Sequence, residues 1–255
     1  MHTIEGSIYA ALSECFKEPS EEFADDIASG RLEEVMQEGL RQLCIPVPSE
    51  RFRSLRLCHP ELVSGSQMMQ GQEIPKQVQD DSNNDRESVF SGEIISVYQK
   101  LKADYHSLFF PLYVVPVESV YKEWSTTDDV TGGMKGEKGF IMGDPAVEMI
   151  NRYRMAGIEI PQIYKDTPDH IAILLEYASL LCENIEKEER ECFVSYHFDW
   201  VEELRKDIHK YSESTFYRAV ADITVDFIQY ERANLISINK VGSAHSTSIS
   251  TGGSI

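Results

Sequence analysis

Apolar residues recur three or four positions apart along most of this 255-residue chain. The run Ile171, Leu174, Leu175, Ala178 and Leu181 shows this spacing most clearly, and no segment alternates apolar and polar residues as a half-buried strand would. A chain with this pattern buries its apolar faces by packing helix against helix. The sequence therefore predicts an all-α fold, a single-domain helical bundle around one core.

Two segments lack the helical period. Residues 49–91 show no sustained apolar spacing and contain a polar run at 79–85. Residues 234–255 are rich in Ser, Gly and Thr and carry Lys240 as their only charged residue. We therefore expect an all-α domain over residues 1–233, with a long disordered insertion at about 49–91, and a disordered tail over 234–255.

The charge balance is strongly acidic. The chain has 24 Lys and Arg against 43 Asp and Glu, a formal net charge of −19. Such a surface repels the phosphates of nucleic acid, so we expect no nucleic-acid partner, whereas it attracts a basic peptide. A second interpretation, in which the acidic surface serves only solubility, stays open.

No part of the sequence resembles a membrane span or a secretory signal, because it holds no run of 18 apolar residues and no basic, then apolar N-terminus. We expect a cytoplasmic protein without stable membrane insertion. Its five cysteines form no CxxC pair, which argues against a disulfide framework or a zinc site. No metal or other cofactor is expected.

The residues before the clearest apolar run have helix-start chemistry. Thr167 suits the N-cap position and Pro168 the first helical position. Asp169 and His170 then fall in the first turn, at the positive end of the helix dipole. We expect a rigid helix start that holds both side chains beside a binding surface. The alternative is that Asp169 only favours the dipole and His170 only packs locally.

Four separated segments carry a family pattern in the same order. They are Tyr105-His106-Ser107-Leu108-Phe109, Glu118-Ser119-Val120-Tyr121, Asp169-His170, and Phe193, His197 and Trp200 followed by Phe216-Tyr217 and Ala221. Over residues 93–231 the sequence resembles the TorD/DmsD/NarJ family of chaperones for molybdenum-cofactor oxidoreductases. The resemblance implies a non-catalytic protein, a monomer or dimer, without a cofactor of its own.

The resemblance also implies a function and a site. The partner would be a molybdopterin-containing oxidoreductase subunit, whose twin-arginine leader, apo core or both are bound until the cofactor is inserted, before export. Asp169 would face the arginines, and His170 would bond the peptide backbone or orient Asp169. The implied peptide-binding residues are Tyr105, Leu108, Phe109, Ser119, Tyr121, Pro168, Asp169 and His170.

Two other kinds of interpretation stay open: purely structural roles for these residues, and a different function. Tyr105, Leu108 and Phe109 are equally suited to core packing, and His106 and His197 to the surface or the edge of the core. A metal- or nucleotide-dependent helical enzyme or regulator using Asp169 and His170 is the competing function. Against it, no HxxxH, HExxH or phosphate-binding loop appears in the sequence.

Overall fold

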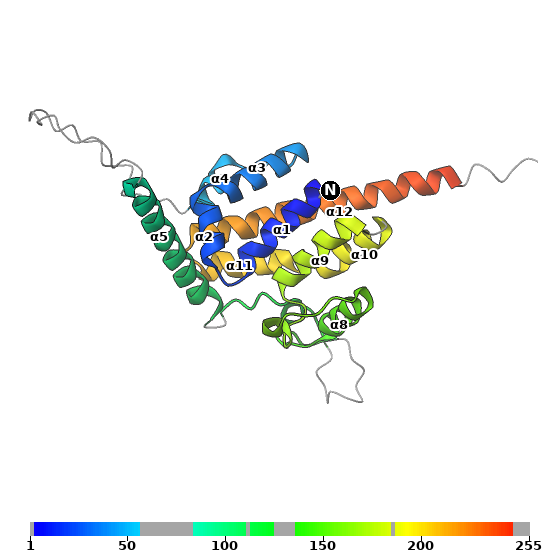
Figure 1. Cartoon of the computed structure of the whole chain (residues 1–255). Helices are drawn as coiled ribbons and strands as arrows, with labels where there is room; N and C mark the ends of the chain where they lie inside the picture. The colour runs from blue at the N-terminus through cyan, green and yellow to red at the C-terminus, as the bar shows by residue number, and fades with distance from the viewer. Residues whose placement is uncertain (1–2, 57–83, 111–112, 125–135, 185–186, 247–255) are drawn as a thin grey trace, which may run out of the picture.

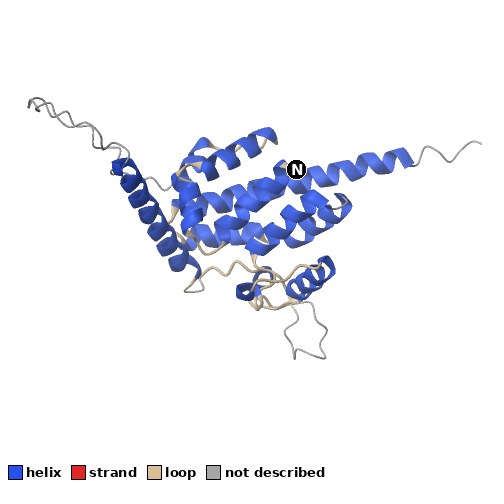
Figure 2. Ribbon diagram, viewed as in Figure 1, coloured by secondary structure: helices blue, strands red, loops and turns tan. Residues whose placement is uncertain are grey.

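The chain folds as helices joined by loops (Figures 1 and 2). The computed structural model describes residues 3–56, 84–110, 113–124, 136–184 and 187–246. These residues form no β-strand, and their only bridge outside helices joins Val117 to His170 in antiparallel fashion. The prediction of an all-α bundle is confirmed. Within the same ranges, no helix combines the length and the apolar character needed to cross a membrane.

Helix α9, Ile171–Asn184, lies at the centre of the core. Its first five residues are all buried, as expected for a helix that is apolar on every side. It packs against α1, Ile4–Phe16. Two hydrogen bonds of 2.8 Å join these helices, from Ser13 Oγ to the Ala172 carbonyl and from Ser179 Oγ to the Gly6 carbonyl. Polar side chains in this interface are thus satisfied, which removes the cost of burying them.

The remaining helices surround this pair. Helices α2 to α4 lie together beside α1, and α5 packs on α2 at one end of the bundle (Figure 1). Helices α10 and α11 both pack on α12, and α10 also packs on α9. Helix α8 lies on the opposite side of α9 from α1. Their bounds are α2 Glu21–Ala28, α3 Arg31–Gln42, α4 Ser49–Ser54, α5 Asn84–Phe109, α6 Glu118–Tyr121, α8 Asp144–Ala156, η1 Gln162–Tyr164, α10 Lys187–His197, α11 Val201–Tyr211 and α12 Thr215–Ser246.

The expected insertion at 49–91 is narrower than predicted. Helix α4 and the start of α5 fall inside that range, and residues 57–83 lie outside the described residues. Phe52 and Leu55 belong to the buried core, and Arg51 forms ion pairs with Asp222 and Asp226 of α12. Helix α4 contains one apolar residue, Phe52, and Leu55 follows it as the C-cap, which is too few for a periodic pattern to be recognised.

The structure is helical over the first part of the predicted tail. Helix α12 continues through Ser246, so only residues 247–255 of the predicted tail lie outside the described part of the chain. The prediction rested on the loss of charged residues after position 233. Helix propagation requires no charge, however, and the sequence from Thr215 to Ser246 contains no proline to end it.

We expect Leu55→Ala to lower the free energy of unfolding by about 2–5 kcal/mol, the range for deleting a buried leucine side chain. The reason is that Leu55 is 1 % exposed and belongs to the core cluster. Urea denaturation followed by circular dichroism measures the change. Arg53→Ala is the matched control on the exposed side of α4, and it should stay within about 0.5 kcal/mol. Equal stability of the two variants would show that α4 is not part of the core.

Candidate functional site

Asp169 joins three chain segments at a buried junction. Its Oδ2 accepts hydrogen bonds from the Ser119 backbone N–H at 2.7 Å and from Ser119 Oγ at 2.5 Å. The Ser119 hydroxyl oxygen in turn accepts the Gly143 N–H at 3.0 Å. Backbone bonds run alongside, because Glu118 N–H donates to the Asp169 carbonyl at 3.0 Å. The turn before α9, helix α6 and the start of α8 therefore meet at one carboxylate.

The environment of Asp169 is closed to solvent, since the residue is 0 % exposed. Burial raises the pKa of the Asp169 carboxyl above its ordinary value, and the two bonds from Ser119 oppose that rise. The same bonds cap the first turn of α6, because they satisfy an N–H group that the short helix leaves without a partner. Asp169 therefore acts on the backbone of its own chain in this structure.

His170 is the residue immediately before helix α9. Its carbonyl accepts the N–H groups of Ile173 and Leu174, and its Nδ1 accepts the N–H of Ala172 at 3.2 Å. The side chain is therefore an N-cap made from a histidine. Burial lowers the pKa of His170 to about 3, because no nearby carboxylate compensates for the desolvated cation. The ring is neutral at physiological pH and accepts through Nδ1.

The predicted helix start is thus corrected by three residues. Residues 167–170 form a turn, closed by the His170 N–H bonding the Thr167 carbonyl at 3.0 Å, and α9 begins at Ile171. The reason is that the end of this turn forms a hydrogen bond with a distant segment of the chain. The Ile171 N–H donates to the Pro116 carbonyl at 2.9 Å. Local cap chemistry at Thr167 and Pro168 was a weaker constraint than these long-range bonds.

A second buried polar group lies next to this junction. Glu118 is fully buried, and its Oε2 lies 2.7 Å from His197 Nδ1, while its Oε1 lies 2.7 Å from Lys122 Nζ. Lys122 also pairs with Asp199 at 3.1 Å. Burial raises the pKa of Glu118, and the contacts with His197 and Lys122 oppose that rise. On the far side of the ring, His197 Nε2 lies 3.5 Å from a carboxylate oxygen of Glu148.

The position of His197 corrects the sequence interpretation, which favoured the surface or the edge of the core. Its side chain is fully buried between α6, α8 and α10. Nothing local in the sequence signals this, because Glu118 and His197 are 79 positions apart. The only available signal was that both residues belong to the segments that carry the family pattern.

The aromatic residues of the pattern pack around these polar groups. The rings of Tyr121 and Trp200 stack with centroids 5.0 Å apart, and Trp200 Nε1 donates to the His197 carbonyl at 2.7 Å. Tyr121 OH donates to Asp207 at 3.0 Å. Every polar tip in this layer has a partner, so the aromatic residues fix the position of α10 and α11 against α6.

The three residues predicted on α5 lie apart from the junction. Leu108 and Phe109 are buried, and the Phe109 ring packs on Tyr217 at 5.5 Å. Tyr105 is half-buried, contacts the Phe109 ring at 4.9 Å, and has a pKa raised by burial to about 12. The contacts of Tyr105, Leu108 and Phe109 in this structure are those of core packing. The structure brings together the other five predicted residues, Ser119, Tyr121, Pro168, Asp169 and His170, in the layer around α6.

Comparison with known proteins agrees with this geometry. A family model described as nitrate reductase delta subunit matches residues 96–214, a range that includes the whole polar junction. A chaperone protein TorD of Colwellia psychrerythraea is 32 % identical over 80 residues, which cover 30 % of this chain and 34 % of that protein. A chaperone protein TorD of Shewanella pealeana is 22 % identical over 134 residues, covering 51 % and 58 %. Over these residues the chain is similar to proteins of the TorD/DmsD/NarJ family. The matched segments span about a third and somewhat more than half of these curated relatives.

The expectation that Asp169 faces the arginines of a peptide is not compatible with the observed burial of its carboxylate. The carboxylate is enclosed and engaged by Ser119. The competing enzyme interpretation needs the same exposure, and Asp169 and His170 instead bond separate partners. Across the described ranges, no three His, Cys, Asp or Glu side chains are grouped as metal ligands.

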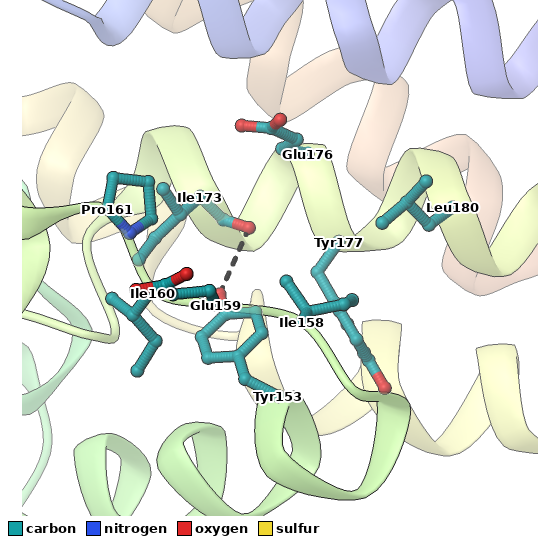
Figure 3. Close-up of a pocket in the computed structure, with 9 residues that line it drawn as sticks. All are labelled: Tyr153, Ile158, Glu159, Ile160, Pro161, Ile173, Glu176, Tyr177 and Leu180. Carbon is teal, nitrogen blue, oxygen red and sulfur yellow. Dashed lines mark hydrogen bonds between the residues drawn. The ribbon is translucent and has the colours of Figure 1, made fainter.

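The structure also shows a hollow that the sequence did not predict. It lies between α8, α9 and the link that joins them, has a volume of about 90 Å³, and is open to solvent on one side (Figure 3). Periodicity cannot reveal it, because its residues come from two helices and a non-helical link. The lining residues are Tyr153, Ile158, Glu159, Ile160, Pro161, Ile173, Glu176, Tyr177 and Leu180.

The lowered pKa of His170 predicts a specific loss of stability in acid. The unfolded chain binds a proton near the ordinary pKa of 6.5, whereas the folded chain does not until about 3. Stability is therefore complete above about pH 6.5 and falls by up to about 1.4 kcal/mol per pH unit below it. In His170→Asn the cap remains, since asparagine is a good N-cap residue, but the titration is removed. Urea unfolding between pH 7.5 and 5 should give a flatter slope for this variant than for wild type.

His106→Asn is the control for this experiment, because His106 is a partly exposed histidine on α5. It should keep the wild-type slope. Asp169 and Glu118 have raised pKa values and so contribute with the opposite sign, which is why the comparison uses the difference between variants. Identical slopes for wild type and His170→Asn would contradict the buried, neutral ring.

Asp169→Ala should destabilise the fold by at least about 1–3 kcal/mol, the cost of leaving buried donors without an acceptor. The donors concerned are the backbone N–H and hydroxyl of Ser119. Thermal unfolding measures the effect. Asp166→Ala, which removes an exposed acid three residues earlier, should melt within a degree or two of wild type. A melting temperature for Asp169→Ala equal to that of its control would show that the junction carries no stability.

Proposed function

We propose that this protein is a cytoplasmic maturation chaperone for a molybdopterin-containing oxidoreductase. It binds the twin-arginine leader of the client subunit, its apo core or both, and it holds the client for cofactor insertion before export. It performs no catalysis on the client and needs no cofactor of its own. It acts as a monomer or a dimer.

The observation that carries this proposal is the convergence of the family-pattern segments. Residues 118–121, 169–170 and 193–200 come from distant parts of the chain and meet around Glu118, Ser119 and Asp169. The segments in which this sequence resembles TorD chaperones are therefore in contact in this structure, where they form one packed, hydrogen-bonded unit. This supports carrying the chaperone activity over from those relatives as the proposal.

The surface chemistry supports a basic, partly apolar partner. The net charge of −19 favours association with a cationic segment. Apolar side chains that could receive the apolar part of a leader are exposed around α8 and η1, with Met155 at 88 % and Ile163 at 76 %. In this proposal the eight residues predicted from the sequence support the binding surface from beneath, and only Tyr105 among them keeps substantial exposure.

The test uses a fluorescent synthetic leader in which two arginines precede an apolar stretch. We expect binding by anisotropy, with an association rate that falls as NaCl rises from about 50 mM to about 500 mM, because salt shortens the range of charge steering. A leader with both arginines replaced by glutamine is the matched control and should associate more slowly, with little salt dependence. Absence of binding to both the leader and the apo client would refute the proposed function.

A further inference from the structure

The link between α8 and α9 contains a non-helical stretch with unpaired backbone groups. The Ile158 N–H bonds the Tyr153 carbonyl at 2.8 Å, and Tyr164 N–H bonds the Pro161 carbonyl at 2.9 Å. Between them, Glu159 and Ile160 make no backbone hydrogen bond with any described residue. A stretch with free N–H and C=O groups can pair with an extended chain, which is the common mode of strand addition.

An apolar hollow lies directly against this stretch. Figure 3 shows Ile160 and Pro161 on one side and Ile173 of α9 behind them, with the Tyr153 ring in front. The hydroxyl of Tyr153 donates to the Ile173 carbonyl at 3.2 Å, so the polar tip of this ring is already satisfied. The hollow therefore offers a chiefly apolar surface, of a size suited to one or two aliphatic side chains.

Only one of the two carboxylates that line the hollow is available to a ligand. Two carboxylates line it, but Glu176 is paired with Lys17 at 3.2 Å, and Figure 3 shows its carboxylate on the far side of α9. Glu159 forms no ion pair with any residue in the described ranges. Its carboxylate is exposed beside the unpaired backbone, where it can receive a guanidinium group in bidentate geometry.

The surface continues beyond the hollow on both sides. A neighbouring depression shares Tyr153, Ile158, Glu159 and Ile160, and a second one shares Tyr177 and runs past Met155. An occupant longer than one side chain can therefore lie along the link. Arg154 and Lys165 line the first depression together with Glu159, so Glu159 is the acidic member of a mixed-charge surface there.

We propose that the Ile158–Pro161 link and its hollow form a docking site for an extended peptide of apolar residues next to an arginine. The apolar side chain enters the hollow, the peptide backbone pairs with Glu159 and Ile160, and the arginine pairs with the Glu159 carboxylate. The occupant is the junction between the arginines and the apolar stretch of the client leader. This assignment rests on the proposed function and names the surface that performs it.

The test measures leader binding to the full chain and its variants. Glu159→Gln removes the charge without changing size and should weaken binding by about fivefold, whereas Asp166→Asn, an exposed acid outside the hollow, should change it by less than about twofold. Ile160→Lys should weaken binding further by placing a cation beside the hollow. Circular dichroism and melting temperature should stay at wild-type values, because both positions are at least partly exposed.

Amide hydrogen exchange separates this site from the proposed function. Leader binding should protect the Glu159 and Ile160 amides. If the leader binds wild type, Glu159→Gln and Asp166→Asn alike and leaves these amides unprotected, the docking site is overturned while the chaperone proposal stands. If no leader binds, but a synthetic apolar peptide with a single arginine protects the same amides, the docking site stands and leader recognition fails. If neither peptide binds, the docking site is wrong, and the chaperone proposal is refuted as well only if the apo client also fails to bind.

Discussion

The hydrogen bonds between the Asp169 carboxylate and Ser119 are the constraint on which the rest of the site depends. They join the turn before α9 to α6, and the Ser119 hydroxyl extends the connection to Gly143 at the start of α8. Because these groups are buried, no water replaces a lost partner. The central helix α9 therefore fixes the positions of α6 and α8 through one side chain, and the surface link after α8 inherits that position.

A chain of contacting polar side chains extends this constraint across three helices. Lys122 and His197 flank Glu118, and Glu148 follows on the far side of His197, where Arg152 bonds it at 2.7 Å. Buried ion pairs seldom add much net stability, because desolvation offsets the attraction, but they strongly disfavour arrangements that leave one member alone. The chain therefore selects one relative placement of α6, α8 and α10. These contacts therefore determine how the three helices are arranged more than they increase the free energy of unfolding.

The parts of this structure that follow local rules could be predicted from the sequence, and the parts set by long-range contacts could not. Helical period identified the core helices, because a helix must bury its apolar side. The start of α9 could not be placed, since it depends on bonds between Asp169 and a serine 50 positions away. The short helix α4 was not predicted, because the burial of Phe52 and Leu55 depends on tertiary contacts that the local sequence does not reveal. The pairing of Glu118 with His197 was hidden for the same reason.

The burial of the family-pattern residues explains why the family could be recognised while the client could not be named. Ser119, Asp169 and His197 are each constrained by several fixed neighbours, so few other residues satisfy those positions. The link at Glu159 and Ile160 has no such neighbours on its open side. Its sequence is free to follow the chemistry of a partner without affecting the core. Under the proposed function, recognition of a particular client would therefore depend on exposed positions of this kind, held in place by the buried junction beneath them.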